Sequence, residues 1–276
     1  ALVYASITGF GQSGPYRDRP GYDNVIQAMS GLMSITGTAD GEPLKVGVAV
    51  ADVLTGMFAL AGVLAALRQA EMTGQGQYLD FALLDCQLAG LVNVASNALV
   101  SGVTPGRYGN QHPNIVPYQT FTASDGDFMI AVGNDRQFTQ LCQMIERGDL
   151  VTDPHFATNP QRVKNRAALI PLLQTIFITR PANFWVEQLV EFGIPAGPIN
   201  TVTAALNDSH IRERNMVREI SLTNGARLPY VASPLQSEGD VRYPPPMLGE
   251  HTEEILRDVM SMDHDAVEHY RATGVI

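Results

Sequence analysis

The amino-acid sequence predicts a two-part α/β protein, and three observations predict it. Short apolar runs typical of strands alternate with longer stretches of helical periodicity in the first hundred residues. A segment rich in glycine and proline but without periodicity, residues 102–117, separates this part from a second one. The 276 residues are 45% hydrophobic and 17% charged, a balance that suits folded domains with buried cores.

The elements of the first part follow from its apolar pattern. Apolar and small residues alternate at 2–8, which predicts a strand; the polar loop GFGQSGPYRDRPG follows, and a helix is expected at 23–34. After TGTADGEPLKVG a long helix begins near Asp52, because apolar residues recur there at helical spacing: Val53, Met57, Leu60, Val63, Leu64 and Leu67. YLDFALL predicts a second strand, and a helix rich in small residues runs to about residue 100.

The long helix resembles a membrane span in length and apolarity. We expect a buried core helix instead, because Asp52 carries a charge and three glycines weaken the apolar run.

The second part is predicted to be an α+β module. PYQTFTA and DFMIAVG form a predicted hairpin around Ser-Asp-Gly, and helices are expected at 135–147, 162–177 and 182–192. Extended runs between 216 and 243 turn at Asn224-Gly225, and two short amphipathic helices end the chain. These patterns predict a domain at 1–101, a linker at 102–117, a small domain at 118–221 and a return at 222–276.

Charge and cysteine content exclude several classes of function. Eighteen basic against 28 acidic residues give a net charge of −10, and no run of basic residues occurs, so nucleic-acid or anionic-membrane binding is not expected. Cys86 and Cys142 have no partners at zinc spacing, which predicts a reduced, cytoplasmic setting and no metal site. The opening ALVYASITGF has neither an initiator Met nor the regions of a signal peptide, so we expect the sequence to start within a longer protein.

Asp52 is the ionisable residue that most needs an explanation. Asp is a favoured helix N-cap, which stabilises a helix by about 1 kcal/mol. The same place also suits a nucleophile, since a helix N-terminus favours the ionised carboxylate and apolar surroundings would leave it poorly solvated. Such a carboxylate could attack an acyl carbon and form a covalent intermediate. The two interpretations are compatible.

Two further stretches carry candidate residues. His112 lies in GRYGNQHPNIVPYQTF, where no Ser or Cys motif offers a triad, so a structural role competes with a functional one. Gly133 and Asn134 end a predicted strand before a helix, where backbone N–H groups could approach an anion, although ordinary turns have the same composition. Phosphate-loop, serine-elbow, zinc-protease and kinase motifs are absent from the sequence.

Several motifs in order resemble one enzyme family. YASITGFGQSGPYRDRPGYDNVIQAMSGLMSITG, GVAVADVLTGMFALAGVLAAL, GNQHPNIVPYQTF, GIPAGPIN and LGEHTEEIL are similar to the family III CoA-transferases, also called CaiB/BaiF, which include formyl-CoA transferase. The resemblance implies a Rossmann-like large domain with a smaller inserted α+β domain, two interlocked subunits in a homodimer, and an N-terminal segment before Ala1.

The resemblance also implies roles for named residues. Asp52 matches the nucleophile that attacks the acyl-CoA thioester, passing through a mixed anhydride and an aspartyl-CoA thioester before a small carboxylic acid takes the CoA. Tyr22 matches a position whose backbone lies beside that aspartate. Gly109, Asn110, Gln111 and His112 fall where formyl-CoA transferase has a glycine run that closes over the intermediate, and only Gly109 of that run remains.

Substrate identity and two alternatives stay open. Coenzyme A thioesters are expected as substrates rather than as bound cofactors, with succinyl-CoA or another dicarboxylyl-CoA as the donor and Arg136 as a candidate partner for a second carboxylate. A related α-methylacyl-CoA racemase would place a catalytic His at Tyr22, and tyrosine is a poor base near neutral pH. A non-catalytic CoA-binding or dimerising fragment is the third hypothesis.

Overall fold

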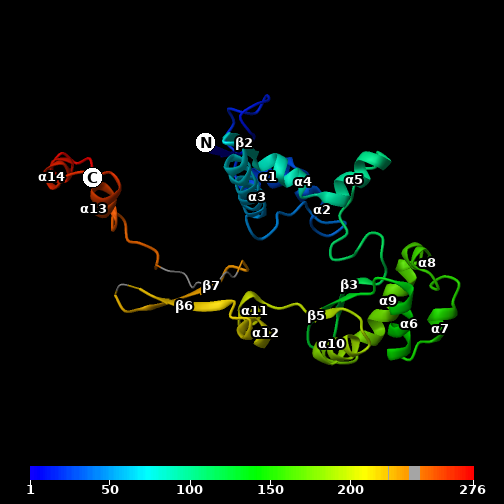
Figure 1. Ribbon diagram of the computed structural model, residues 1–276. Helices are drawn as coiled ribbons and strands as arrows, with labels where there is room; N and C mark the ends of the chain where they lie inside the picture. The colour runs from blue at the N-terminus through cyan, green and yellow to red at the C-terminus, as the bar shows by residue number, and fades with distance from the viewer. Residues whose placement is uncertain (223, 236–242) are drawn as a thin grey trace. The chain divides into compact units, whose positions relative to one another are not determined.

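The computed structural model describes residues 1–222, 224–235 and 243–276 and has the mixed α/β composition that the sequence predicts (Figure 1). Its contacts divide the chain into two compact units, residues 1–199 and 200–276. This boundary lies inside the predicted small domain of 118–221, and the predicted domain limits remain a prediction.

A β-α-β arrangement organises the start of the first unit. Strand β1 (Val3–Thr8) pairs in parallel with β2 (Gln77–Ala82), in a register that runs from Val3 opposite Gln77 to Thr8 opposite Ala82. The long helix α3 (Val50–Thr73) connects them and contacts both strands. It ends at Gly74, whose positive φ of 72° suits the left-handed residue that terminates many helices. Both strands and this helix confirm the expected elements.

Two of the predicted helices are each divided in two. The expected helix at 23–34 is α1 (Asp23–Met29) and α2 (Leu32–Ile35), because Gly31 between them has a φ of 90°. The small-residue helix is α4 (Leu83–Ala89) and α5 (Val92–Ser101), which meet at an angle of 77°. Val92 has a φ of 39° at this bend.

Helix α3 exposes most of its large apolar residues, so the expectation of a buried core helix is wrong. Ala51, Thr55, Ala59 and Ala66 are buried. Val53, Met57 and Leu64 are 63%, 53% and 58% exposed. Small side chains allow close packing: a Cβ placed on Gly62 would lie 2.6 Å from the Phe81 ring. By length and composition alone α3 could cross a membrane, a test that soluble core helices also pass.

The second half of this unit has its own hydrophobic core. Strands β3 (Tyr118–Thr122), β4 (Asp127–Ala131) and β5 (Ala196–Pro198) form an antiparallel sheet with the order β3-β4-β5. The helices of this half are α6 (Asp135–Met144), α7 (Asp149–Thr152), α8 (Asn159–Lys164), α9 (Arg166–Phe177) and α10 (Ala182–Glu191). Phe121, Phe128, Phe177 and Trp185 pack through edge-on and tilted ring contacts in this core. The hairpin and the three expected helical regions are confirmed.

The second unit contains short helices and a hairpin. Helices α11 (Val202–Asn207) and α12 (Ser209–Glu213) precede the antiparallel strands β6 (Val217–Ser221) and β7 (Arg227–Val231). Gly225 has a φ of 82° in the predicted turn. The chain continues through α13 (Thr252–Glu254), a π-helical turn η1 (Ile255–Val259) and α14 (His264–Ala272). Residues 223 and 236–242, which belong to the predicted extended runs between 216 and 243, lie outside the described residues.

Candidate functional site

Asp52 lies in the first turn of α3, at the third helical residue. The carboxylate is well placed there with respect to the helix dipole. However, Asp52 is not the cap that the sequence suggested: the N-cap position is Ala49, which offers no side-chain acceptor, and the Ala51 N–H donates to Asp23 Oδ1 at 2.9 Å. The helix is therefore capped from a different element, and the carboxylate of Asp52 is not needed for this bond.

Asp52 is exposed in this chain, so the expected poor solvation is not present. Its neighbour Val53 and the preceding Val48 are both 63% exposed, and Met57 one turn along is 53% exposed. The large apolar residues close to Asp52 in the sequence are therefore open to solvent themselves.

Tyr22 lies next to Asp23, the residue that caps helix α3. It occupies the N-cap position of α1, and its backbone carbonyl accepts from the Val25 and Ile26 N–H groups. Because Asp23 bonds Ala51, the sequence neighbours of Tyr22 and Asp52 are joined by one hydrogen bond. Tyr22 as a whole residue is 81% exposed.

A glycine pair sets where α1 begins. A Cβ on Gly9 would lie 2.7 Å from the Gly21 Cα atom, and the reverse substitution would bring a Cβ to 2.9 Å from Gly9. Both ends of the loop between β1 and Tyr22 therefore approach each other as only glycines allow. Because Gly9 follows β1 and Gly21 precedes Tyr22, this contact brings Tyr22 and Asp23 close in space to the carboxyl end of β1.

The Gly109–His112 loop is held by two arginines. The Arg107 guanidinium donates to the carbonyls of Ser34, Thr38 and Gly41, and the Gly109 N–H donates to the Gly37 carbonyl at 2.9 Å. From the other side, Arg166 donates to the carbonyls of His112 and Pro113 and to Gln111 Oε1. Gly109 has a φ of 57°, which favours glycine at this position.

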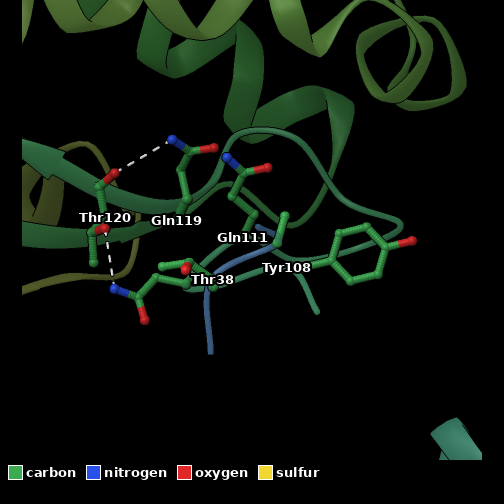
Figure 2. A pocket seen from close by; sticks show the side chains of 8 residues that line it. Thr38, Tyr108, Gln111, Gln119 and Thr120 are labelled. Carbon is green, nitrogen blue, oxygen red and sulfur yellow. Dashed lines mark hydrogen bonds between the residues drawn. The ribbon is translucent and has the colours of Figure 1, made fainter. Parts of the chain in front are cut away.

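Two cavities adjoin this loop. Figure 2 shows the first, of about 340 Å³, lined by Thr38, Ala39, Tyr108, Gly109, Asn110, Gln111, Gln119 and Thr120. Within it Asn110 Nδ2 lies 3.4 Å from Thr120 Oγ1, and Gln119 is 9% exposed. A second cavity of about 420 Å³ lies against α5 and is lined by Asn93, Asn97, Tyr108 and Gln111 among others. Three of the four predicted loop residues thus line one pocket of neutral polar character.

His112 faces inward and has a structural environment. The His112 ring stacks on the Tyr118 ring with centroids 5.2 Å apart, and the backbone N–H of His112 donates to the Tyr118 carbonyl at 2.9 Å. His112 Nδ1 accepts from the Asn114 N–H at 3.1 Å, which assigns the ring proton of a neutral imidazole to Nε2.

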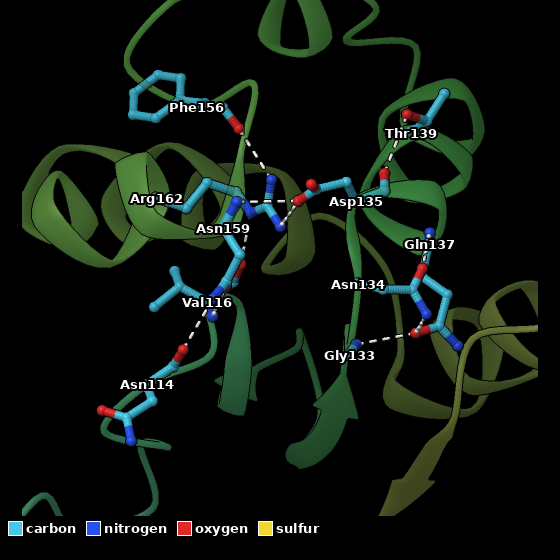
Figure 3. Close-up of polar contacts among 10 residues, drawn as sticks. All are labelled: Asn114, Val116, Gly133, Asn134, Asp135, Gln137, Thr139, Phe156, Asn159 and Arg162. Atoms are coloured by element: carbon cyan, nitrogen blue, oxygen red, sulfur yellow. Dashed lines mark hydrogen bonds and ion pairs between the residues drawn. The ribbon is translucent and has the colours of Figure 1, made fainter.

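Gly133 and Asn134 form an ordinary capped turn (Figure 3). Asn134 Oδ1 accepts from the Gln137 N–H at 2.9 Å, so Asn134 is the N-cap of α6. The Gly133 N–H donates to Gln137 Oε1 at 2.8 Å, and Gln137 Nε2 donates to the Gly193 carbonyl. A substrate anion here would have to displace the Gln137 side chain, so the structure does not bring these two residues to an open site.

Sequence reasoning missed Asp23, Gln27, Arg107 and Arg166. A signal for the first two was present: DNVIQAM places the carboxylate of Asp23 and the amide of Gln27 one helical turn apart, on the same face of the helix. The arginines carry no such signal, because each donates to backbone carbonyls of residues more than fifty positions away. In the part of the chain that the structure describes, no cluster of three His, Cys, Asp or Glu side chains could hold a metal ion.

The family model and two similar relatives all point to the same protein family. The family model of CoA-transferase family III matches residues 1–252. The succinate–glutarate CoA-transferase of Agrobacterium fabrum is 41% identical over 96% of this chain and 67% of its own length. The succinyl-CoA:glutarate CoA-transferase of Mus musculus is 38% identical over the whole chain and 64% of its own length. The chain therefore spans about two thirds of these relatives.

Solved structures agree with the sequence comparison. A CaiB/BaiF family protein from Brucella suis is 43% identical and superimposes with a TM-score of 0.79, covering 93% of this chain and 68% of that one. A protein from Mycobacterium tuberculosis with 27% identity gives the same TM-score over 91% of this chain and 68% of its own. The chain belongs to CoA-transferase family III.

Proposed function

We propose that this protein transfers CoA from an acyl-CoA to a free carboxylic acid and that Asp52 is its nucleophile. The observation that carries the proposal is the position of Asp52, an ionisable side chain in the first turn of an apolar helix. Its neighbour Ala51 is hydrogen-bonded to Asp23, the first residue of α1. Membership of the family supports the reaction class.

The proposed chemistry balances without a cofactor. The Asp52 carboxylate attacks the thioester carbonyl, the carbon–sulfur bond breaks, and a mixed anhydride and CoA thiolate form. The thiolate attacks the aspartyl carbonyl and releases the donor acid. The acceptor carboxylate then displaces the thiolate from aspartyl-CoA, and attack of this thiolate on the acceptor's acyl carbon regenerates Asp52. Each step conserves the energy of the thioester.

Water exclusion has to come from what binds at Asp52. The carboxylate is exposed in this chain, and an anhydride left in water would hydrolyse. Val48, Val53 and Met57 are exposed apolar residues close to it in the sequence, and theirs is the surface that we propose becomes covered. An acyl-CoA or a second polypeptide that covers this surface would remove water from the carboxylate. Asp52 is then shielded in the complex rather than in the free chain.

Dicarboxylic acids are the acceptors and succinyl-CoA the donor that we propose. The activities for which the relatives are named support this choice: two act on succinyl-CoA and glutarate, one on acetyl-CoA and oxalate, and others on succinyl-CoA with citramalate or mesaconate. The pocket at Thr38 and Gly109–Gln111 is a candidate for part of the substrate site. Exposed Arg136 stays a candidate partner for the second carboxylate. A homodimer and a cytoplasmic location belong to the same proposal, supported by the resemblance and by two free, buried cysteines.

A transfer assay with succinyl-CoA and glutarate tests the function. Asp52→Asn should lower kcat by about 10³-fold or more, because the amide cannot form the covalent intermediate. Asp40→Asn, which alters an exposed loop aspartate, is the matched control and should keep the rate. A folded Asp52→Asn variant with a rate within roughly tenfold of the unmodified protein would overturn the assignment.

A further inference from the structure

Two buried polar side chains lie on one face of α1. Asp23 is 8% exposed and Gln27 is 0% exposed, although neither residue type is common in a protein interior. They are one helical turn apart, and Gln27 Nε2 donates to Asp23 Oδ2 at 2.7 Å. Burial of a carboxylate and an amide is costly unless every group has a partner, so their partners indicate what the pair does.

The remaining bonds of this pair go to the segment that leads into α3. The Val46 N–H donates to Gln27 Oε1 at 2.8 Å, Gln27 Nε2 lies 3.3 Å from the Val48 carbonyl, and the Ala51 N–H donates to Asp23 Oδ1 at 2.9 Å. Three backbone atoms within six residues are therefore attached to α1. The last of them belongs to the residue before Asp52.

Upstream of Val46 this segment is also attached where the Leu44 N–H donates to the Thr36 carbonyl at 3.0 Å. Residues 42–49 form neither helix nor strand, and no heavy atom would lie within 4 Å of a Cβ on Gly47. Ala49 supplies no cap of its own. The orientation of the first turn of α3 is consequently set by the bond that Asp23 accepts from Ala51 and by the bonds of Gln27 with Val46 and Val48.

We propose that Asp23 and Gln27 are positioning residues that hold the first turn of α3 so that Asp52 can attack the substrate. The inference rests on the proposed function of Asp52. Attack on a thioester requires the two reacting atoms to be aligned at near-contact distance, and a displacement of about 1 Å can cost about 100-fold in rate. A turn that frays at its start loses this alignment while the rest of α3 stays packed through Thr55, Ala59 and Ala66.

The arrangement of hydrogen-bond donors and acceptors around Asp23 and Gln27 makes the proposal testable. Both oxygens of Asp23 accept hydrogen bonds, one from Ala51 and one from Gln27. In Asp23→Asn, the new Nδ2 group would face a donor on one side or the other, either Ala51 N–H or Gln27 Nε2. In the double variant Asp23→Asn with Gln27→Glu, the amide introduced by the first substitution could again accept from Ala51. It could also donate to the carboxylate introduced by the second, which in turn accepts from Val46.

The decisive measurement is the rate at which Asp52 is acylated in a single turnover with succinyl-CoA, beside kcat, KM and the unfolding midpoint. Asp23→Asn should slow acylation by about 100-fold with little change in KM, and the double variant should recover at least about tenfold of this loss. Gln27→Met, which keeps the volume and removes the hydrogen bonds of the Gln27 amide to Asp23, Val46 and Val48, should also slow acylation. If Asp23→Asn does not fold, Gln27→Met and the double variant decide.

Thr55→Val is the matched control. Thr55 is buried and donates to the carbonyl of the same residue, Ala51. Its side chain also bonds Cys86 of α4, and neither bond involves residues 42–49, which lead into α3. Its loss should lower the unfolding midpoint and leave the acylation rate within about threefold, since the start of the helix stays attached to α1.

The outcomes separate the two claims. Folded Asp23→Asn and Gln27→Met variants that acylate Asp52 within about threefold of the unmodified rate would overturn the positioning role. Failure of both to fold, while Thr55→Val folds, would also overturn it, because the pair would then serve the fold alone. Absence of acylation in the unmodified protein would instead refute the proposed function.

Discussion

At the scale of single residues, buried polar groups here fix backbone rather than perform chemistry. Arg162 is fully buried, and its guanidinium donates to the carbonyls of Val116 and Phe156 and to Asp135 (Figure 3). It also lies over the Phe138 ring. These contacts join three separate segments of the chain to α8. The planar guanidinium suits this task because its donors diverge in fixed directions.

Cys142 gives a residue-scale prediction about pH. Burial raises the pKa of its thiol from 9.0 to about 12, with Asp149 adding to the rise and Arg162 opposing it. The folded state therefore holds the proton more tightly than the unfolded state. The stability from this group is complete below pH 9 and is lost as pH rises from 9 towards 12, by at most about 1.4 kcal/mol per pH unit.

Chemical denaturation at several pH values measures this loss. Cys142→Ala should be less stable at neutral pH, because a small cavity is left, and should show a flatter decline of unfolding free energy between about pH 9 and pH 11. Equal slopes for the two proteins would show that the thiol does not contribute.

At the scale of elements, the buried face of α3 consists of small side chains, and its large apolar side chains are exposed. Helical periodicity located the helix, but the prediction of a buried core helix was wrong, because large apolar residues usually mark a buried face and here they are exposed. Here Ala51, Thr55, Ala59 and Gly62 provide the packing surface, and close approach of the helix to Phe81 of β2 needs the absence of a side chain.

Two glycines of α3 test this packing against each other. Gly62→Ala should destabilise the protein by about 1–3 kcal/mol, since the added Cβ would lie 2.6 Å from the Phe81 ring. Gly56→Ala meets no atom within 4 Å and should stabilise by about 0.5–1 kcal/mol through helix propensity. Thermal or urea unfolding checks both, and equal effects of one sign would contradict the assigned orientation.

At the scale of the whole molecule, the sequence predicted the order and type of most elements but not their contacts. Periodicity located β1, β2, the β3–β4 hairpin and α9, because each has a local pattern. The interruptions at Gly31 and Val92 were missed, since one backbone angle decides them.

The candidate site was predictable to a different degree. Asp52 and Tyr22 came from their motifs, and the structure joins their neighbours through the Asp23–Ala51 bond. The clamp of Arg107 and Arg166 on the Gly109–His112 loop was not predictable, because these side chains bind main-chain carbonyls and so leave no residue-type pattern. Local chemistry is readable from the sequence, whereas long-range contacts to backbone are not.

The central claim is that acyl groups pass through the Asp52 carboxylate. The most direct measurement is turnover of succinyl-CoA with glutarate labelled with ¹⁸O in both carboxylates, followed by mass spectrometry of the digested protein. Attack of the acceptor on aspartyl-CoA leaves one labelled oxygen on the enzyme in each cycle, so the peptide that contains Asp52 should gain one and then two heavy oxygens. Continued turnover without label in that peptide, or with label in a different one, would contradict the account.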